Sequence, residues 1–165
     1  MNPELDCLAS SLGEALLQRG WQLATAESCT GGWIACAVTT VAGSSAWFER
    51  GFVTYSNEAK QDLLGVRSIT LEQAGAVSAA CVEEMALGAL AHSKAMLSVA
   101  VSGIAGPGGG SAHKPVGTVF LAWALRDGGV RSTACHFSGD RQQVRLAAVR
   151  TALDELIRIA AAGRC

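Results

Sequence analysis

The chain is poor in charge, and what charge it has is evenly spread. Only 16% of its 165 residues are charged, and 13 basic against 14 acidic residues give a formal net charge of −1 at pH 7. Lys and Arg form no run or stripe of the kind that nucleic-acid-binding proteins use to contact phosphates. The composition therefore argues against nucleic acid as a partner.

Long apolar runs are also missing. No stretch reaches the length needed to cross a bilayer, and the first residues lack the basic and apolar regions of a secretory signal. We therefore expect a cytoplasmic protein without a membrane partner. Half of the residues are hydrophobic, and 165 residues suit one globular domain, residues 1–165.

Cysteines are present, but none is arranged as C-x-x-C. This spacing indicates neither a zinc site nor a disulfide framework, so we expect no metal and mostly small, buried thiols. The six cysteines are Cys7, Cys29, Cys36, Cys81, Cys135 and Cys165.

Helical and strand-like apolar patterns alternate along the chain, which predicts an α/β sandwich with a mixed sheet. The turn at residues 126–129 has the composition of a tight hairpin and so adds antiparallel strands. On the last helix, Arg145, Arg150 and Arg158 are expected on the solvent side. Helices are predicted up to Gly20 and over residues 33–41, 57–64, 78–92 and 141–161, and strands over residues 21–26, 51–55, 95–101, 116–125 and 130–137.

The most informative segment is Thr-Ala-Glu-Ser-Cys-Thr-Gly-Gly, residues 25–32. Ser28 follows a predicted strand, as a nucleophile does, and Gly31 and Gly32 let backbone N–H groups approach a ligand at a helix start. Such donors stabilise the oxyanion that forms when a serine attacks a carbonyl. The alternative is that Ser28 and Thr30 only cap the next helix.

Three loops with chemical content follow strands of the predicted sheet: residues 27–32, 55–60 and 102–115. Ligands of open α/β sheets bind beyond the carboxyl ends of the strands, so we expect these loops to converge. In the first loop, Glu27 and Thr30 are candidate binding residues, and Cys29 is an alternative nucleophile without an evident base.

A serine nucleophile needs a base, and Lys60 is the preferred candidate. It lies in the first turn of a predicted helix, where the dipole and partial burial lower the pKa of an amine. Tyr55 is a candidate to relay the proton or to hold Lys60. Two alternatives stay open: Lys60 is a surface lysine paired with Glu58 or Asp62, or a histidine is the base. The histidines are His92, His113 and His136, and none stands in a recognisable triad order.

The third loop contains Ser-Gly-Ile-Ala-Gly-Pro-Gly-Gly-Gly, residues 102–110. It matches neither a Walker A loop nor a dinucleotide fingerprint, but bare backbone N–H groups bind anions such as phosphate. Lys114 and Arg141 are candidates for the positive charge, and a simple flexible loop is the alternative. The candidate ligand-binding residues here are Ser102, Gly103, Gly106, Pro107, Gly108 and Arg141.

Taken together, these segments resemble the CinA C-terminal domain family. The shared strings are residues 25–32, 43–60, 75–78, 102–107, 114–119 and 137–141, which span nearly the whole chain in family order. The resemblance implies a three-layer α/β/α sandwich with a mixed, mostly parallel sheet of about five strands.

The same resemblance implies an amidohydrolase that converts nicotinamide mononucleotide (NMN) to nicotinate mononucleotide and ammonia. Ser28 would be the nucleophile, Lys60 and Tyr55 its helpers, and no metal or other cofactor is implied. Two alternatives are a non-catalytic nucleotide-binding module and an amidase of the same mechanism acting on another amide. The apolar composition and four tryptophans favour a homo-oligomer, with a dimer first.

Overall fold

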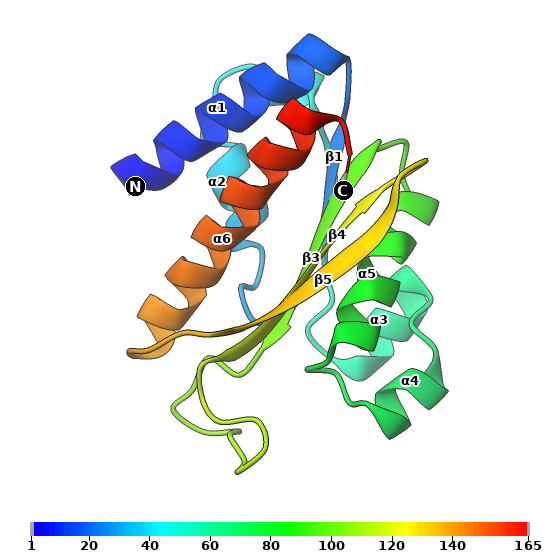
Figure 1. The fold of residues 1–165 in the computed structure, drawn as a ribbon, viewed down its shortest axis with the longest axis vertical. Helices are drawn as coiled ribbons and strands as arrows, with labels where there is room; N and C mark the ends of the chain where they lie inside the picture. Colours follow the sequence, from blue (N-terminus) through cyan, green and yellow to red (C-terminus); the bar gives the residue numbers. More distant parts are fainter. Residues whose placement is uncertain (1, 165) are drawn as a thin grey trace.

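The computed structural model describes residues 2–164 and forms three layers (Figure 1). Helices α1, α2 and α6 cover one face of a central sheet, and α3, α4 and α5 cover the other. This is the α/β fold expected from the sequence. The helices are α1 (Pro3–Arg19), α2 (Trp33–Val38), α3 (Asn57–Leu64), α4 (Ser68–Gln73), α5 (Ala79–Ala91) and α6 (Arg141–Ala162), with a short 3₁₀ helix η1 (Ser44–Ala46).

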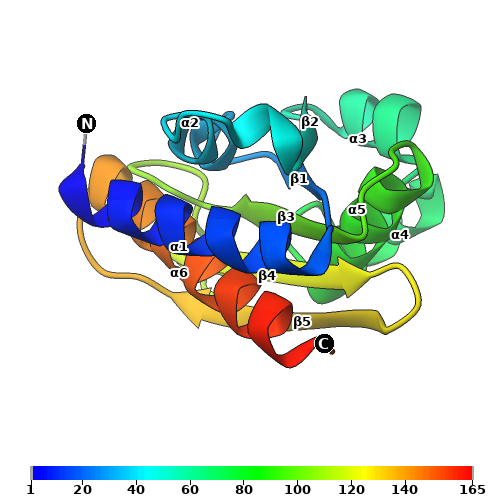
Figure 2. The ribbon, with the colours of Figure 1, turned by 90° about the horizontal axis from the view of Figure 1, so that it is seen from above.

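Within the described residues the sheet has five strands in the order β2-β1-β3-β4-β5, which follow one another from top to bottom in Figure 2. Strands β1, β2 and β3 are parallel to one another, and β4 runs against both of its neighbours. The mixed sheet is therefore confirmed. The strands are β1 (Leu23–Glu27), β2 (Phe48–Val53), β3 (Leu97–Gly103), β4 (Thr118–Leu125) and β5 (Gly129–His136).

Helices α3 and α6, which start near the carboxyl ends of β1 to β3, begin at side-chain caps. The Ser56 side chain accepts from Ala59 N–H at the start of α3. Asp140 and Gln143 form a capping box at the start of α6. These caps satisfy N–H groups that a helix start leaves free, and so fix where each helix begins.

The two faces of the sheet are packed differently. The face under α1, α2 and α6 is filled by large side chains such as Leu12, Leu153 and Trp47. The other face is mostly alanine, so α5 lies close to the strands. A Cβ at Gly88 of α5 would lie 2.0 Å from the Leu64 carbonyl oxygen, so α3 packs on α5 with no side chain between them. The alanines are Ala24, Ala26, Ala86, Ala89, Ala95, Ala100, Ala122 and Ala124.

Strand register brings three loops to one edge of the sheet. Glu27 is paired with Val53 of β2 and with Val101 of β3. Ser28, the next residue, therefore lies level with the residues that follow Val53 and Val101. Ser28 N–H also donates to Val101 O at 3.0 Å. At this edge the chain leaves β1 for α2, and β1 lies between β2 and β3. The carboxyl ends of the strands in an open α/β sheet are the usual place for a ligand.

Several expectations need correction. Strand β2 begins three residues before the predicted Gly51, and helix α2 ends at Val38. Helix α4 was not predicted, because its N-cap, Arg67, makes no side-chain capping bond and leaves no signal in the sequence. Among the cysteines, Cys7 and Cys36 are exposed and not buried, and Cys165 lies outside the described residues.

No helix within residues 2–164 is both long enough and apolar enough to cross a membrane.

Candidate active site

The structure brings Ser28 and Lys60 into direct contact. Lys60 Nζ donates to Ser28 Oγ at 3.1 Å and to the Thr54 carbonyl at 2.8 Å, with a longer contact to the Tyr55 carbonyl at 3.5 Å. Strand alternation explains the meeting: Ala24 and Ala26 face α5, so Ser28 points to the same face, from which α3 presents Lys60.

Lys60 is a buried lysine without a carboxylate partner. Its side chain is only 1% exposed, and none of the ion pairs among the described residues includes it. Burial therefore lowers the pKa of the Lys60 ammonium below its ordinary value, because the charged form loses its hydration. The surface pairing with Glu58 or Asp62, considered from the sequence, is wrong.

The histidines take no part in this contact. His92 Nδ1 lies 2.9 Å from the Gly88 carbonyl, and no histidine among the described residues is bonded to Ser28. Residues 2–164 also contain no cluster of three or more His, Cys, Asp or Glu side chains that could hold a metal ion.

Glu27 organises the turn from within. Its buried carboxylate accepts from Thr30 Oγ1 at 2.6 Å and from the N–H groups of Ile34 and Ala35 at 2.9 and 2.8 Å. It therefore supplies the cap that Gly32, the N-cap residue, has no side chain to make. The structure places Glu27 behind the turn, as a support for it.

Some N–H groups of the turn remain for an oxyanion. Gly31 N–H donates to Ser28 O at 3.0 Å and Trp33 N–H to Thr30 O at 3.3 Å. Of the described N–H groups between Ser28 and Trp33, those of Cys29, Thr30 and Gly32 are left as donors. Gly31 and Gly32 have φ of 62° and 92°, a left-handed backbone that other residues rarely adopt.

Cys29 is a poor nucleophile in this position. It is 7% exposed, and burial raises the pKa of its thiol to about 11. The thiolate, which is the reactive form, is thus scarce at neutral pH.

Arg141, at the start of α6, connects the other two loops. It donates to the Gly106 carbonyl at 2.9 Å and to the Tyr55 hydroxyl at 3.0 Å. Tyr55 is 61% exposed, and its contact with Lys60 is through the backbone carbonyl and not through the ring hydroxyl. Arg141 is thus linked to the Lys60 side of the site through Tyr55, whose hydroxyl it contacts and whose carbonyl lies near Lys60 Nζ.

A cavity of about 420 Å³ lies next to Arg141, and its volume is within the usual range for small-ligand pockets. Ser28 and Lys60 do not line it, and Arg141 is the residue that links it to Tyr55 and the glycine-rich loop. Its lining residues are Trp33, Arg141, Gln142 and Arg145. Two guanidinium groups on one cavity wall favour an anionic ligand.

The glycine-rich loop is split between buried and exposed residues. Ser102 and Gly106 are buried, whereas Pro107 and Gly108 are exposed and Gly103 lies at the end of β3. Lys114, a candidate for the positive charge, donates instead to the Ala74 carbonyl at 2.9 Å. Arg141 is therefore the cation that the structure places on this loop.

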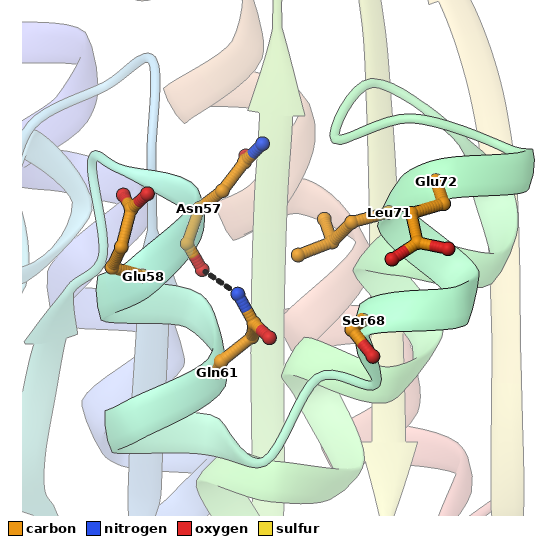
Figure 3. Close-up of a pocket in the computed structure, with 6 residues that line it drawn as sticks. All are labelled: Asn57, Glu58, Gln61, Ser68, Leu71 and Glu72. Carbon is orange, nitrogen blue, oxygen red and sulfur yellow. Dashed lines mark hydrogen bonds between the residues drawn. The ribbon is translucent and has the colours of Figure 1, made fainter.

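A second cavity lies on the outer side of α3, between α3 and α4 (Figure 3). It measures about 240 Å³, and Glu58 and Glu72 contribute carboxylates to its lining. Ser28 and Lys60 are not among its lining residues, so it is separate from the candidate active site.

With this geometry in view, residues 5–160 match the family model described as the CinA C-terminal domain. The chain belongs to the CinA C-terminal domain family. Among its CinA-type relatives, nicotinamide-nucleotide amidohydrolase PncC of Enterobacter agglomerans is 58% identical over 155 residues, which cover 92% of this chain and 94% of the relative.

The protein of the same name from Escherichia coli K12 is 57% identical over 154 residues, 93% of each chain. Among solved structures, that of competence/damage inducible protein CihA from Agrobacterium tumefaciens superposes with a TM-score of 0.94 at 50% identity. It covers 96% of this chain and 97% of its own. The family resemblance read from the sequence is thus confirmed.

Two parts of this CinA-family site were not predicted from the sequence. The Thr54 carbonyl holds Lys60, which no side-chain motif could reveal. Arg145 was expected on the solvent side of α6, but it turns inward and donates to the carbonyls of Cys29 and Thr30. The spacing of four between Arg141 and Arg145, about one helical turn, is the sequence signal that could have placed both on one face of α6.

Proposed function

We propose that this chain is an amidohydrolase that converts NMN to nicotinate mononucleotide and ammonia, with Ser28 as nucleophile and Lys60 as base. The observation that carries the proposal is the contact between the buried Lys60 amine and Ser28 Oγ at 3.1 Å. The substrate is proposed from the relatives named nicotinamide-nucleotide amidohydrolase, which match over nearly their whole length.

The surroundings of Lys60 favour its action as a base. The carbonyls of Thr54 and Tyr55 can only accept hydrogen bonds, so they take two N–H groups of the amine. When Lys60 is neutral, its lone pair is then left for the hydroxyl hydrogen of Ser28. Desolvation makes this neutral form accessible, which is what general-base catalysis requires.

The reaction would then run in two halves. Ser28 Oγ bonds to the amide carbon while its proton passes to Lys60; the C–N bond breaks, and Lys60 returns the proton to the departing ammonia. Water then attacks the acyl-enzyme ester, Lys60 takes the water proton, and Ser28 recovers it as the acid leaves. The N–H groups of Cys29, Thr30 and Gly32 are the available donors for the oxyanion in both halves.

Incubation of the purified protein with NMN tests the function directly. We expect ammonia and nicotinate mononucleotide in equal amounts, with none from the Ser28→Ala variant. Binding of NMN without ammonia would support a non-catalytic nucleotide-binding module. Ammonia from another amide but not from NMN would support an amidase of different specificity. The expected homodimer is a separate proposal, which light scattering after size exclusion tests.

The phosphate of NMN gives a further prediction, since Arg141 contacts the glycine-rich loop and lines a cavity together with a second guanidinium, that of Arg145. Nicotinamide riboside has the same amide but no phosphate. Its kcat/KM should be lower than that of NMN by about tenfold to a hundredfold, because one charge-assisted contact contributes roughly 1.5–3 kcal/mol. Steady-state ammonia assays on both substrates measure this difference.

Arg141→Met should reduce kcat/KM for NMN and leave that for the riboside almost unchanged. Arg158→Met is the matched control, because Arg158 lies on the same helix with 78% of its side chain exposed. Equal kcat/KM values for the two substrates in the wild type would show that the phosphate is not recognised.

A further inference from the structure

Arg145 donates two hydrogen bonds to the turn that follows Ser28. From α6, its Nε donates to the Cys29 carbonyl at 3.1 Å and its Nη2 to the Thr30 carbonyl at 2.7 Å. The guanidinium also lies over the Trp33 ring, 5.2 Å from its centroid. Two hydrogen bonds and a stacking contact hold it in one orientation, although its side chain is not part of the Ser28–Lys60 pair.

Because a peptide bond is planar, these hydrogen bonds also fix the directions of the N–H groups in the same two peptides. In a trans peptide the N–H points opposite to the C=O, so a carbonyl held from one side directs the following N–H to the other. The bond to the Cys29 carbonyl thus turns Thr30 N–H away from Arg145. The bond to the Thr30 carbonyl does the same for Gly31 N–H, which donates to Ser28 O.

The two faces of the sheet decide where Thr30 N–H then points. Arg145 reaches the turn from α6, on the face packed with large side chains. Ser28 and Lys60 meet on the opposite face, beside α3 and α5. An N–H directed away from Arg145 is therefore directed toward the side on which the amide carbonyl is attacked.

We propose that Arg145 is a positioning residue: through the Cys29 carbonyl it directs Thr30 N–H toward the oxyanion, and through the Thr30 carbonyl it fixes the turn that carries this donor. The inference rests on the proposed function for the serine nucleophile and for the identity of the substrate. The planar fork of a guanidinium suits two successive carbonyls, whereas a lysine ammonium can replace the charge but not the geometry.

Arg145 also lines the cavity next to Arg141, so the competing role is a direct contact with the substrate phosphate. The two roles predict different kinetics. A positioning residue affects the transition state and therefore kcat, equally for NMN and nicotinamide riboside. A phosphate ligand affects NMN alone.

The experiment compares Arg145→Met and Arg145→Lys with wild type and with the exposed control Arg158→Met. We expect Arg145→Met to lower kcat by about 10²-fold on both substrates with KM nearly unchanged, since a displaced oxyanion donor has effects of this size. Arg145→Lys should recover little of the loss. Melting temperatures of the variants establish whether they are folded. If Arg145→Met does not fold, Arg145→Lys takes its place in the comparison.

A second measurement does not depend on NMN. A fluorophosphonate labels a reactive serine through an oxyanion-stabilised step, so its rate of reaction with Ser28 should fall in the Arg145 variants. An unchanged labelling rate, or a loss confined to NMN, would overturn the positioning role. Absence of ammonia from wild type would instead overturn the proposed function, and the labelling rate would still test Arg145.

Discussion

Ser28→Ala is expected to abolish ammonia release from NMN. Removal of Oγ removes the acyl-enzyme route, and the rate should fall by about 10³-fold or more. Because Ser28 is small and its backbone bond to Val101 is kept, the fold and the binding of NMN should survive. Single-turnover assays for ammonia and calorimetric titration with NMN measure the two properties separately.

Cys29→Ala is the matched control, one residue away in the same turn. Its buried thiol, with the pKa raised to about 11, has no role in the proposed mechanism. We expect it to keep most of the activity. If Ser28→Ala were active and Cys29→Ala inactive, the nucleophile would be Cys29.

The second large effect is expected from Lys60→Arg. The guanidinium keeps the positive charge but does not lose a proton at any working pH, so it cannot accept one from Ser28. The rate should fall by several orders of magnitude, as for loss of the nucleophile, because the two side chains act as a unit. In Lys60→Met the new side chain fills the space of the lysine methylene groups but has no amine, so this variant should be equally inactive. Lys94→Met, at an exposed lysine, should resemble wild type.

The pH dependence of the wild type follows from the same residue. Only neutral Lys60 acts as a base, so kcat/KM should rise with pH as its proton is lost. Since burial lowers the pKa of Lys60, the rise should occur below the ordinary lysine range. A rate that stays constant from about pH 5 to pH 9 would contradict this role, as would an active Lys60→Arg variant.

Much of this site was predictable from local sequence. A serine followed by two glycines after an apolar strand, and a lysine one turn into a capped helix, each carry a local signal that correctly located the two loops. The α/β class followed from alternating periodicities, and the edge at which the loops meet followed from the rule for open sheets. Long shared segments made the family recognisable.

The remaining parts depend on contacts that local patterns do not encode. Arg145 looked like one more arginine on a polar helix face, and only the packing of α6 against the turn reveals its carbonyl partners. The Glu27 carboxylate likewise accepts from the N–H groups of Ile34 and Ala35 at the start of α2, and these contacts form only because the chain reverses between residues 27 and 34. Tyr55 was expected to help Lys60, but its hydroxyl is bonded to Arg141, so any catalytic role for it stays a prediction.

The burial of Lys60 has a consequence for the stability of the protein. The pKa of Lys60 is lower in the folded chain than in the unfolded one. At pH values between these two pKa values the unfolded chain binds more protons, so the free energy of unfolding rises with pH across this range. Below the folded-state pKa the whole penalty is present, so at acidic pH the lysine opposes folding. The favourable packing of the rest of the fold must outweigh this opposition. The fold therefore gives up part of its stability to hold a neutral amine beside a serine.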